Sequence, residues 1–321
     1  MCGGKPLTGK VKVDGAKNSV LPIMAALILN DSGRETIIQD VPRIKDVSVM
    51  CRILKSLGVE IIDKGNEMIF NTSRISSHKI ADELTREMRS SIFLMGPLLA
   101  RLGKVALCEP GGCAIGLRPI DLHIKGLITL GAQITESWEE NEKVISVACD
   151  KLLGGKVHLD FPSVGATENV MMAAVKAEGE TIIFNAAKEP EIVDLQNFLN
   201  KFGAEIRGAG TDTIRINGPK PISGGSYRVI PDRIVAGTFL MAAGVTGGDI
   251  FLKNVIPHHL EAVISKLREV GLKIYEGDNW LRVIGGDLKG VGKVKTQAYP
   301  GFPTDLQAPM MALLTLAQGK S

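Results

Sequence analysis

Four segments of the chain share one pattern of apolar and polar positions: two apolar residues three positions apart, then a glycine, then an alternating run. The glycines that end this pattern are Gly58, Gly131, Gly203 and Gly271. Each follows an amphipathic stretch that opens near an acidic residue, in turn Asp46, Asp121, Asp194 and Glu261. A glycine after the last apolar turn is typical of a helix end, and alternation is typical of a strand. We therefore expect four helices, each leading through its glycine into a strand.

A second set of helices is predicted from apolar runs rich in alanine and methionine, such as "MMAAVKAEG" and "LMAAGVTGG". These runs end at Gly33, Gly103, Gly179, Gly247 and Gly319. Helices that are apolar all round must be buried on several sides. Both sets recur about every 70 residues, which indicates one repeated βαβ-type unit. The pattern therefore predicts an α/β fold in which units wrap around central helices, and not an open sheet.

The count of helices bears on the last unit. The alanine-rich helix occurs five times and the amphipathic helix four times before Ser321. Every earlier copy continues into a strand, as in "ETIIQDV" and "DIFLKNV". We expect from this that the last domain is incomplete. The alternative is that Gly319 closes the chain as a simple helix cap.

Length and composition narrow the class of protein. A chain of 321 residues is longer than one usual core, so two domains are expected. A net charge of +3 without a basic run sets nucleic acid aside. The apolar stretch Val20 to Leu29 is too short to cross a bilayer, so we expect a cytoplasmic protein with no membrane insertion. Five scattered cysteines disfavour a disulfide framework and a zinc site, and no P-loop or dinucleotide fingerprint occurs, so we expect no metal and no cofactor.

One loop of the second copy departs from the repeat. The segment between the two helix-ending glycines has 28 residues there, against 25, 24 and 24 in the other copies. The extra length lies in "GGCAIGLRPID", residues 111 to 121. Its glycines permit close approach of the backbone to a ligand. Pro119 suits the first position of a helix running from about Ile120 to Leu130, and a helix start beside Arg118 favours anions.

The same setting favours a thiolate at Cys113, which predicts a reactive cysteine. The alternative is a small loop residue with no chemical role. Cys51, Cys108 and Cys149 lie in apolar stretches and are expected in the core.

Other polar residues stand at the starts of the apolar helices. Lys17 and Asn18 are the first residues of the first apolar helix. A lysine at this place can bind an anion or can simply be solvated. Arg86 and Arg89 take the equivalent place in the second copy, so the helix starts are expected to converge on one polar cleft. In the third copy the turn in "FPSVGATEN", residues 161 to 169, has backbone N–H groups suited to phosphate. Asp305 in the fifth copy fits either a helix cap or a general base.

Taken together, seven segments closely resemble one enzyme family. They are "GAKNSVLP", "MRSSIFLMGPLLARLG", "GGCAIGLRPIDLHI", "FPSVGATENVMMAA", "EPEIVDL", "PDRIVAGTFL" and "PGFPTDLQAP". The family is that of the UDP-N-acetylglucosamine enolpyruvyl transferases, or 1-carboxyvinyltransferases, of bacterial peptidoglycan synthesis. The resemblance implies an inside-out α/β barrel with βαβαββ units in two domains. Domain one would span residues 17–228, and a truncated domain two would comprise residues 1–16 and 229–321.

The resemblance also implies a reaction: the enolpyruvyl group of phosphoenolpyruvate passes to the 3′-hydroxyl of UDP-N-acetylglucosamine, and phosphate is released. Cys113 would protonate the methylene carbon and be alkylated by fosfomycin, and Asp305 would accept the hydroxyl proton. Cations at Lys17, Arg89 and Arg118 would balance the substrates' negative charge. The residues expected to bind the nucleotide sugar are Asn18, Arg118, Pro119, Ile120, Asp121, Leu122, Pro162, Ser163, Val164, Gly165 and Asp305.

Two departures and two rival functions qualify this resemblance. The opening "MCGGKPL" is shorter than the family's first strand, and the family has further phosphate-binding arginines in the region beyond Ser321, so a weak or inactive catalyst is expected. A non-catalytic nucleotide-sugar-binding paralogue is one rival. The related transferase acting on shikimate 3-phosphate is the other, although it lacks a cysteine loop of this kind.

Overall fold

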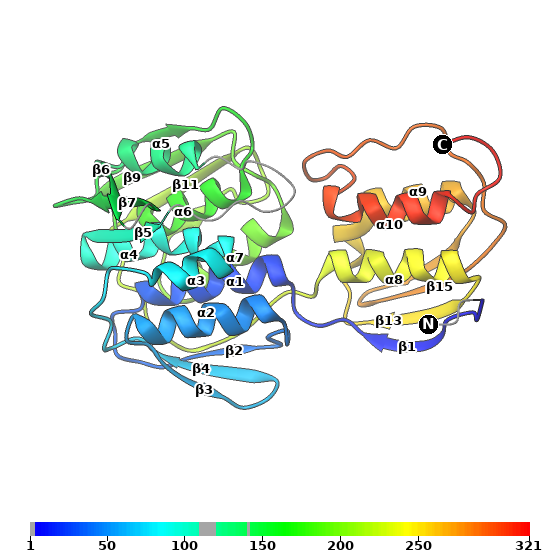
Figure 1. The fold of residues 1–321 in the computed structure, drawn as a ribbon, viewed down its shortest axis with the longest axis horizontal. Helices are drawn as coiled ribbons and strands as arrows, with labels where there is room; N and C mark the ends of the chain where they lie inside the picture. The colour runs from blue at the N-terminus through cyan, green and yellow to red at the C-terminus, as the bar shows by residue number, and fades with distance from the viewer. Residues whose placement is uncertain (1–3, 109–119, 140–141) are drawn as a thin grey trace. The chain divides into compact units, whose positions relative to one another are not determined.

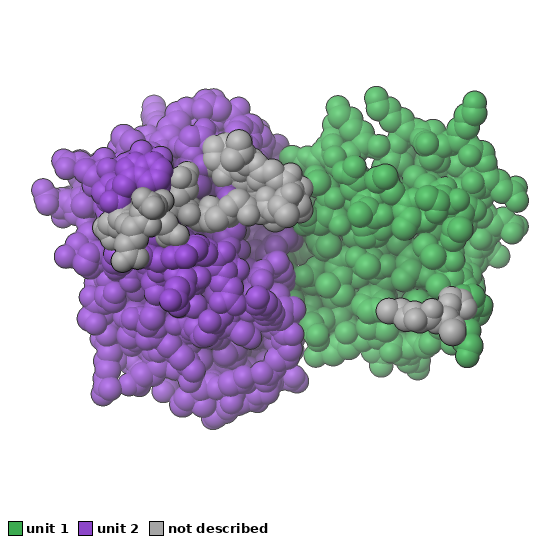
Figure 2. Space-filling view, viewed as in Figure 1, with its two compact units in different colours: residues 1–16, 230–321 green, residues 17–229 purple. Residues whose placement is uncertain are grey.

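The computed structural model describes residues 4–108, 120–139 and 142–321. The chain divides into two compact units, one of residues 17–229 and one of residues 1–16 with 230–321 (Figure 2). None of the helices in the described part combines the length and the apolar character that crossing a bilayer requires.

The strands are short and the helices mostly run for two to four turns (Figure 1). The strands are β1 Thr8–Lys12, β2 Thr36–Gln39, β3 Glu60–Asp63, β4 Glu67–Asn71, β5 Lys104–Cys108, β6 Gln133–Glu139, β7 Glu142–Ala148, β8 Lys156–His158, β9 Gly179–Phe184, β10 Ile206–Arg207, β11 Thr213–Gly218, β12 Ser226–Arg228, β13 Asp249–Lys253, β14 Lys273–Gly277 and β15 Trp280–Ile284. The α-helices are α1 Lys17–Ala26, α2 Lys45–Ser56, α3 Asp82–Glu87, α4 Met95–Leu102, α5 Asp121–Thr129, α6 Val164–Ala174, α7 Pro190–Lys201, α8 Arg233–Thr246, α9 Glu261–Val270 and α10 Gln307–Leu314. The 3₁₀ helices are η1 Leu27–Leu29, η2 Arg89–Leu94, η3 Pro257–Leu260 and η4 Thr304–Leu306.

The sheets of the described residues repeat one topology. Their strand orders are β12-β2-β4-β3, β5-β7-β6, β10-β11-β9-β8 and β1-β13-β15-β14. In each, a strand leads through a helix to an antiparallel hairpin whose second strand pairs with the first. In three of them the first strand also has a parallel partner from elsewhere in the chain: β12 beside β2, β8 beside β9 and β1 beside β13. The repeated unit predicted from the glycine spacing is thus confirmed.

The alanine-rich helices form the centre of the unit of residues 17–229. Every residue from Ser19 to Ala26 in α1 is buried, as is every residue from Ala166 to Ala174 in α6. Helix α6 packs against α4, α5 and α7, and α1 packs against α2 and α7. Figure 1 shows strands β2, β4 and β3 on one side of helix α2. The apolar pattern therefore correctly predicts central helices with sheets outside them.

Helix ends follow the glycine pattern more closely than helix starts follow the acidic residues. Gly58, Gly131, Gly203 and Gly271 all have positive φ, which a glycine adopts without strain. Helices α2, α5 and α9 begin at or next to the predicted acidic residue. The prediction for the third helix is wrong, because α7 begins at Pro190 and Asp194 lies inside it. Proline has a fixed φ that suits a first helical position, and it starts the helix early.

The buried Asp194 joins three elements of this unit. The hydroxyl of Ser19 in α1 donates to Oδ2 of Asp194. The phenol of Tyr227 in β12 donates to Oδ1 at 2.6 Å and lies 3.1 Å from the Asp194 carbonyl oxygen. Burial and the neighbouring carboxylate raise the pKa of Tyr227, so the phenol keeps its proton. The start of α1 is therefore held to α7 by a hydrogen-bonded carboxylate.

Replacing Tyr227 by phenylalanine should destabilise the protein by about 1–3 kcal/mol, because Oδ1 of a buried carboxylate loses its phenol donor. Urea unfolding of the Tyr227→Phe variant measures this. Tyr275→Phe is the matched control, since that side chain is 52% exposed. Equal stability of both variants and the parent protein would contradict the role given to the Asp194 network.

Glu168 is the unusual residue of the core. It lies in α6 with no exposed surface, and neither carboxyl oxygen has a hydrogen-bond partner. Burial first, and then the carboxylates of Glu191 and Glu189, raise its pKa well above the usual value. The folded protein therefore holds a proton that the unfolded chain releases above its ordinary pKa of about 4.3.

Because the native state binds this extra proton, Glu168 lowers stability as the pH rises between the unfolded and the folded pKa. Glu168→Gln removes the titration, so its stability relative to the parent should increase with pH above about 5, by up to about 1.4 kcal/mol per pH unit. Urea unfolding at several pH values measures the difference. Glu35→Gln, at an exposed position, should show no such trend. A pH-independent difference for Glu168→Gln would rule out a neutral Glu168.

Candidate active site

The predicted loop residues Cys113, Arg118 and Pro119 lie outside the described residues. The residues that follow them are described: Ile120 is the residue before α5, and Asp121 and Leu122 begin it. The predicted helix from about Ile120 to Leu130 is confirmed. The first helical position is Asp121, however, so the assignment of that position to Pro119 is wrong. Asp121 is exposed while Leu122 is buried, which anchors the helix start and leaves one carboxylate at the surface.

The turn predicted to bind phosphate forms the start of α6. The Ser163 hydroxyl accepts a hydrogen bond from the Ala166 N–H at 3.4 Å and caps the helix. Pro162 before it is exposed, and Val164 and Gly165 form the first turn. The first N–H groups of a helix have no partner within it and carry partial positive charge. This arrangement can bind an anionic group.

Helices α5 and α6 are joined on both sides of this turn. Lys125 of α5 forms an ion pair with Asp160, with Nζ 2.9 and 2.8 Å from the two carboxylate oxygens. His123 of α5 lies against Gly165, where a Cβ atom would be 2.9 Å from Cε1 and 3.2 Å from Nε2 of the imidazole. Glycine is thus required at position 165 for the ring to pack there. The starts of α5 and α6, predicted separately, are brought together.

His123 was not among the residues predicted from the sequence. It is 8% exposed, and its Nδ1 lies 2.8 Å from the side-chain nitrogen of Asn169 in α6. Burial first, and then the positive charge of Arg89, lower its pKa to about 4, while Asp121 opposes them. The one signal in the sequence is its place directly after the predicted stretch 118–122. Alone, a histidine inside an apolar helix pattern does not distinguish a binding residue from a core residue.

Lys17 and Asn18 occupy the exposed first turn of α1, as predicted. The Lys17 ammonium lies 2.5 Å from the Asp46 carboxylate of α2. Arg89 begins η2, which packs against α1, and its charge acts on His123. Arg89, Asp121, His123 and Gly165 are therefore neighbours within one unit, and Lys17 lies on a helix that packs against the same 3₁₀ segment.

Asp305 belongs to the other unit, of residues 1–16 and 230–321. It lies exposed in η4, before α10. Its carboxylate has no hydrogen bond or ion pair among the described residues, and Leu306 is the residue preceding α10. The helix-cap interpretation of Asp305 is therefore wrong, and its role as a general base stays a prediction.

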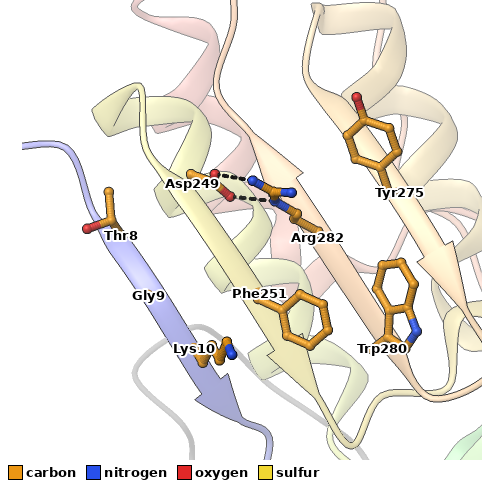
Figure 3. Close-up of a pocket in the computed structure, with 8 residues that line it drawn as sticks. All are labelled: Thr8, Gly9, Lys10, Asp249, Phe251, Tyr275, Trp280 and Arg282. Carbon is orange, nitrogen blue, oxygen red and sulfur yellow. Dashed lines mark hydrogen bonds and ion pairs between the residues drawn. The ribbon is translucent and has the colours of Figure 1, made fainter.

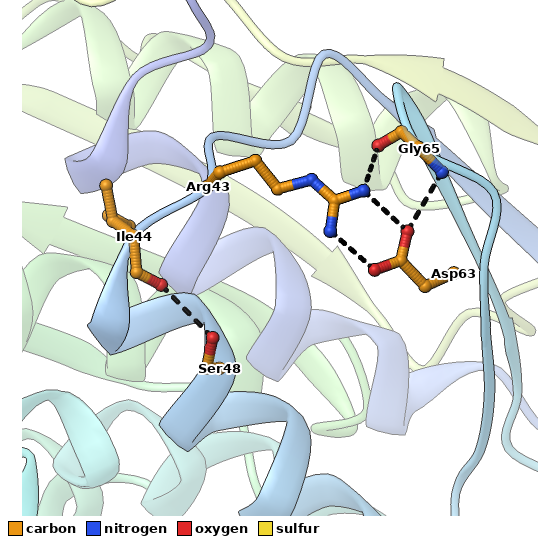
Figure 4. A network of polar contacts seen from close by, with 5 residues as sticks. All are labelled: Arg43, Ile44, Ser48, Asp63 and Gly65. Atoms are coloured by element: carbon orange, nitrogen blue, oxygen red, sulfur yellow. Dashed lines mark hydrogen bonds and ion pairs between the residues drawn. The ribbon is translucent and has the colours of Figure 1, made fainter.

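Two surface hollows lie away from these candidates. One, of about 590 Å³, covers the outer face of the β1-β13-β15-β14 sheet, where Phe251 stacks on Trp280 and Arg282 pairs with Asp249 (Figure 3). The other, of about 240 Å³, adjoins α2, where Arg43 holds Asp63 with two hydrogen bonds of 2.6 and 2.9 Å (Figure 4). Of the predicted site residues that the structure describes, none lines either hollow.

The described cysteines contrast with the role predicted for Cys113. Cys108 is buried, and Cys51 and Cys149 are partly buried. Burial raises the pKa of Cys51 to about 11 and also raises that of Cys149, so both hold their protons at neutral pH. Within the described ranges, no group of three or more His, Cys, Asp or Glu side chains is arranged to hold a metal ion.

Comparison with known proteins identifies the family of the chain. The family model described as EPSP synthase (3-phosphoshikimate 1-carboxyvinyltransferase) matches residues 1–321. A UDP-N-acetylglucosamine 1-carboxyvinyltransferase of Finegoldia magna is 52% identical over 321 residues, which covers 98% of this chain and 74% of that protein. UDP-N-acetylglucosamine 1-carboxyvinyltransferase 1 of Caldanaerobacter subterraneus is 52% identical over 316 residues, with the same coverage.

Solved structures show the same fold at much lower identity. The enolpyruvyl transferase NikO of Streptomyces tendae superposes with a TM-score of 0.87 at 19% identity and covers 99% of this chain and 74% of that one. EPSP synthase of Acinetobacter baumannii gives 0.68 at 22% identity, with 90% and 67% covered. The inside-out α/β fold of the enolpyruvyl transferases is thereby confirmed. From the match over its whole length and the identity to these relatives, the chain belongs to the EPSP synthase family and, within it, to the UDP-N-acetylglucosamine 1-carboxyvinyltransferases.

Proposed function

We propose that this protein transfers the enolpyruvyl group of phosphoenolpyruvate to the 3′-hydroxyl of UDP-N-acetylglucosamine and releases phosphate, a step of peptidoglycan synthesis. The observation that carries the proposal is the identity of about 50% to enzymes named for this activity across almost the whole chain. The cytoplasm is the proposed location, since Cys51 and Cys149 form no disulfide, which fits a reducing compartment.

The proposed chemistry is an addition followed by an elimination. The 3′-oxygen of the sugar forms a bond to C2 of phosphoenolpyruvate and gives its proton to Asp305. Cys113 gives its thiol proton to C3, so the methylene becomes a methyl group in a tetrahedral adduct. The C2–O bond to phosphate then breaks as C3 returns a proton to the Cys113 thiolate, which restores both the double bond and the thiol. An acid at carbon and a base at oxygen are what addition across a vinyl group requires.

Charge stabilisation is the second part of the proposal. Phosphoenolpyruvate and the diphosphate are both strongly anionic, so fixed cations lower the energy of bound substrate and adduct. We assign this role to Lys17, Arg89 and Arg118, with Asn18 beside the acceptor sugar. The exposed first turn of α1 and the position of Arg89 near Asp121 and His123 support this assignment.

The nucleotide sugar is proposed to bind where α5 and α6 begin. The backbone N–H groups of Val164 and Gly165 and the Ser163 hydroxyl suit the diphosphate, because a helix N-terminus attracts anions. Arg118, Pro119, Ile120, Asp121 and Leu122 before and within the start of α5 would line the nucleotide, with Pro162 at the edge. The Lys125–Asp160 ion pair and the His123–Gly165 packing support a fixed distance between the two helix starts.

A phosphate-release assay tests the reaction. Phosphate should appear, at the low rate expected of a weak catalyst, with phosphoenolpyruvate and UDP-N-acetylglucosamine, and not when shikimate 3-phosphate replaces the nucleotide sugar. Cys113→Ala should lower the rate at least about 100-fold, because the acid that protonates C3 is lost. Cys51→Ala is the matched control, since burial keeps that thiol protonated. If phosphoenolpyruvate releases phosphate with shikimate 3-phosphate and not with UDP-N-acetylglucosamine, the choice of acceptor is wrong. If Cys113→Ala keeps the rate of the parent protein, the mechanism is wrong.

Fosfomycin provides a second readout on the same cysteine. The reagent should modify Cys113, faster in the presence of UDP-N-acetylglucosamine, and leave Cys51, Cys108 and Cys149 intact, as peptide mass spectrometry can measure. A binding protein without turnover would release no phosphate yet still bind the nucleotide sugar, which separates the two functions.

A further inference from the structure

The orientation of the Asn169 side chain determines the proton position on His123. Oδ1 of Asn169 accepts a hydrogen bond from the Gly96 N–H at 2.8 Å, and Nδ2 donates to the Ile92 carbonyl oxygen at 3.0 Å. These two backbone partners fix which end of the side-chain amide is the oxygen and which is the nitrogen. Nδ2 is therefore the group that faces Nδ1 of His123 at 2.8 Å. Because Nδ2 is a donor, Nδ1 must accept, and the hydrogen of the neutral ring is on Nε2.

The surroundings of the ring keep it neutral. A proton on Nδ1 would break the bond to Asn169 and place a charge in a site that is 8% exposed. Among the residues that the structure describes, the charged groups that act on His123 are Arg89 of η2, which opposes protonation, and Asp121 of its own helix, which favours it. Helix α6 presents Asn169 and Gly165 to the ring. His123 is thus held as a neutral hydrogen-bond donor through the physiological pH range.

The donor on Nε2 has no hydrogen-bond partner among the described residues. Nε2 is not among the fully buried polar atoms that lack a partner, although the His123 residue as a whole is only 8% exposed, so the donor is placed where a ligand can reach it. The Cε1–Nε2 edge of the ring faces Gly165, the second residue of α6. At that place the free N–H groups of an 11-residue helix already favour an anion. A donor and a helix start are therefore directed at the same small region.

We propose that His123, fixed by Asn169 in its Nε2–H form, donates a hydrogen bond to a phosphate oxygen of the nucleotide sugar at the first turn of α6. The inference rests on the proposed function, because it assumes that the diphosphate binds there. Asn169 is a positioning residue that acts through the imidazole. Such a donor binds an anion with the same strength across neutral pH, which a titrating histidine does not.

Calorimetric titration with UDP-N-acetylglucosamine tests the contact. His123→Phe keeps an aromatic ring of similar size and removes the donor, so the dissociation constant should rise about 10- to 100-fold, as for loss of a hydrogen bond to a charged group. UDP should show the same loss and uridine none. His158→Phe, at an exposed position in β8, should bind like the parent. Equal affinities in the parent and His123→Phe, or an equal loss for uridine, would overturn the inference.

The Asn169→Asp variant separates a positioning role from a purely structural one, because only a positioning role predicts a change in the pH dependence of binding. The carboxylate would accept from Nδ1–H, so the neutral ring would turn its Nε2 lone pair to the phosphate. Affinity should then fall as the pH rises from 6 to 8, whereas the parent stays constant. Nitrogen-15 NMR of the ring reports the change of tautomer directly. A parent ring carrying its hydrogen on Nδ1 would overturn the inference even if His123→Phe failed to fold.

The two proposals fail in different ways. If the parent binds no UDP-N-acetylglucosamine, the proposed function fails and this inference with it. If the parent binds the nucleotide sugar and the pH dependence of Asn169→Asp equals that of the parent, only the inference fails.

Discussion

The complete burial of helix α6 is the constraint on which the rest of the site depends. Its residues from Ala166 to Ala174 are all buried, and α4, α5 and α7 pack around them. The first turn, from Val164 to Gly165, is the part of the helix that is not fully buried. The N–H groups of Val164 and Gly165 have no hydrogen-bond partner among the described residues, and a helix start of this kind favours an anion.

Polar contacts around this core hold the helix starts in place. Asn169 is itself fully buried and bonds to Gly96, Ile92 and His123, so one amide joins α4, η2, α5 and α6. Asp194 holds α1 in place in the same way, because it accepts hydrogen bonds from Ser19 and Tyr227. Buried polar groups of this kind are costly unless every bond is made, and they therefore hold a single arrangement. The helices that carry Lys17 and the 163–165 turn are thus positioned by the buried side chains of Asp194 and Asn169.

The fold could be predicted from the sequence to a large extent, because its signals are local. Glycines with positive φ end the helices at Gly58, Gly131, Gly203 and Gly271, and apolar runs show which helices are central. Helix starts were harder, since Pro190 begins α7 four residues before the acidic residue that marked it. The sequence left Asp305 open between a helix cap and a general base, because a capping residue and an exposed acid have the same local sequence, and the structure shows no cap there.

Within the site, the predicted stretch 120–122 and the 163–165 turn meet as neighbours, but the link between them could not be predicted. That link is the contact of His123 with Asn169 and Gly165, which joins residues 42 to 46 positions apart and has no periodic signal.

The most direct measurement is a crystal structure with UDP-N-acetylglucosamine bound. The diphosphate should lie within hydrogen-bond distance of the N–H groups of Val164 and Gly165 and of Nε2 of His123. A nucleotide sugar bound with its diphosphate away from the first turn of α6 would contradict it.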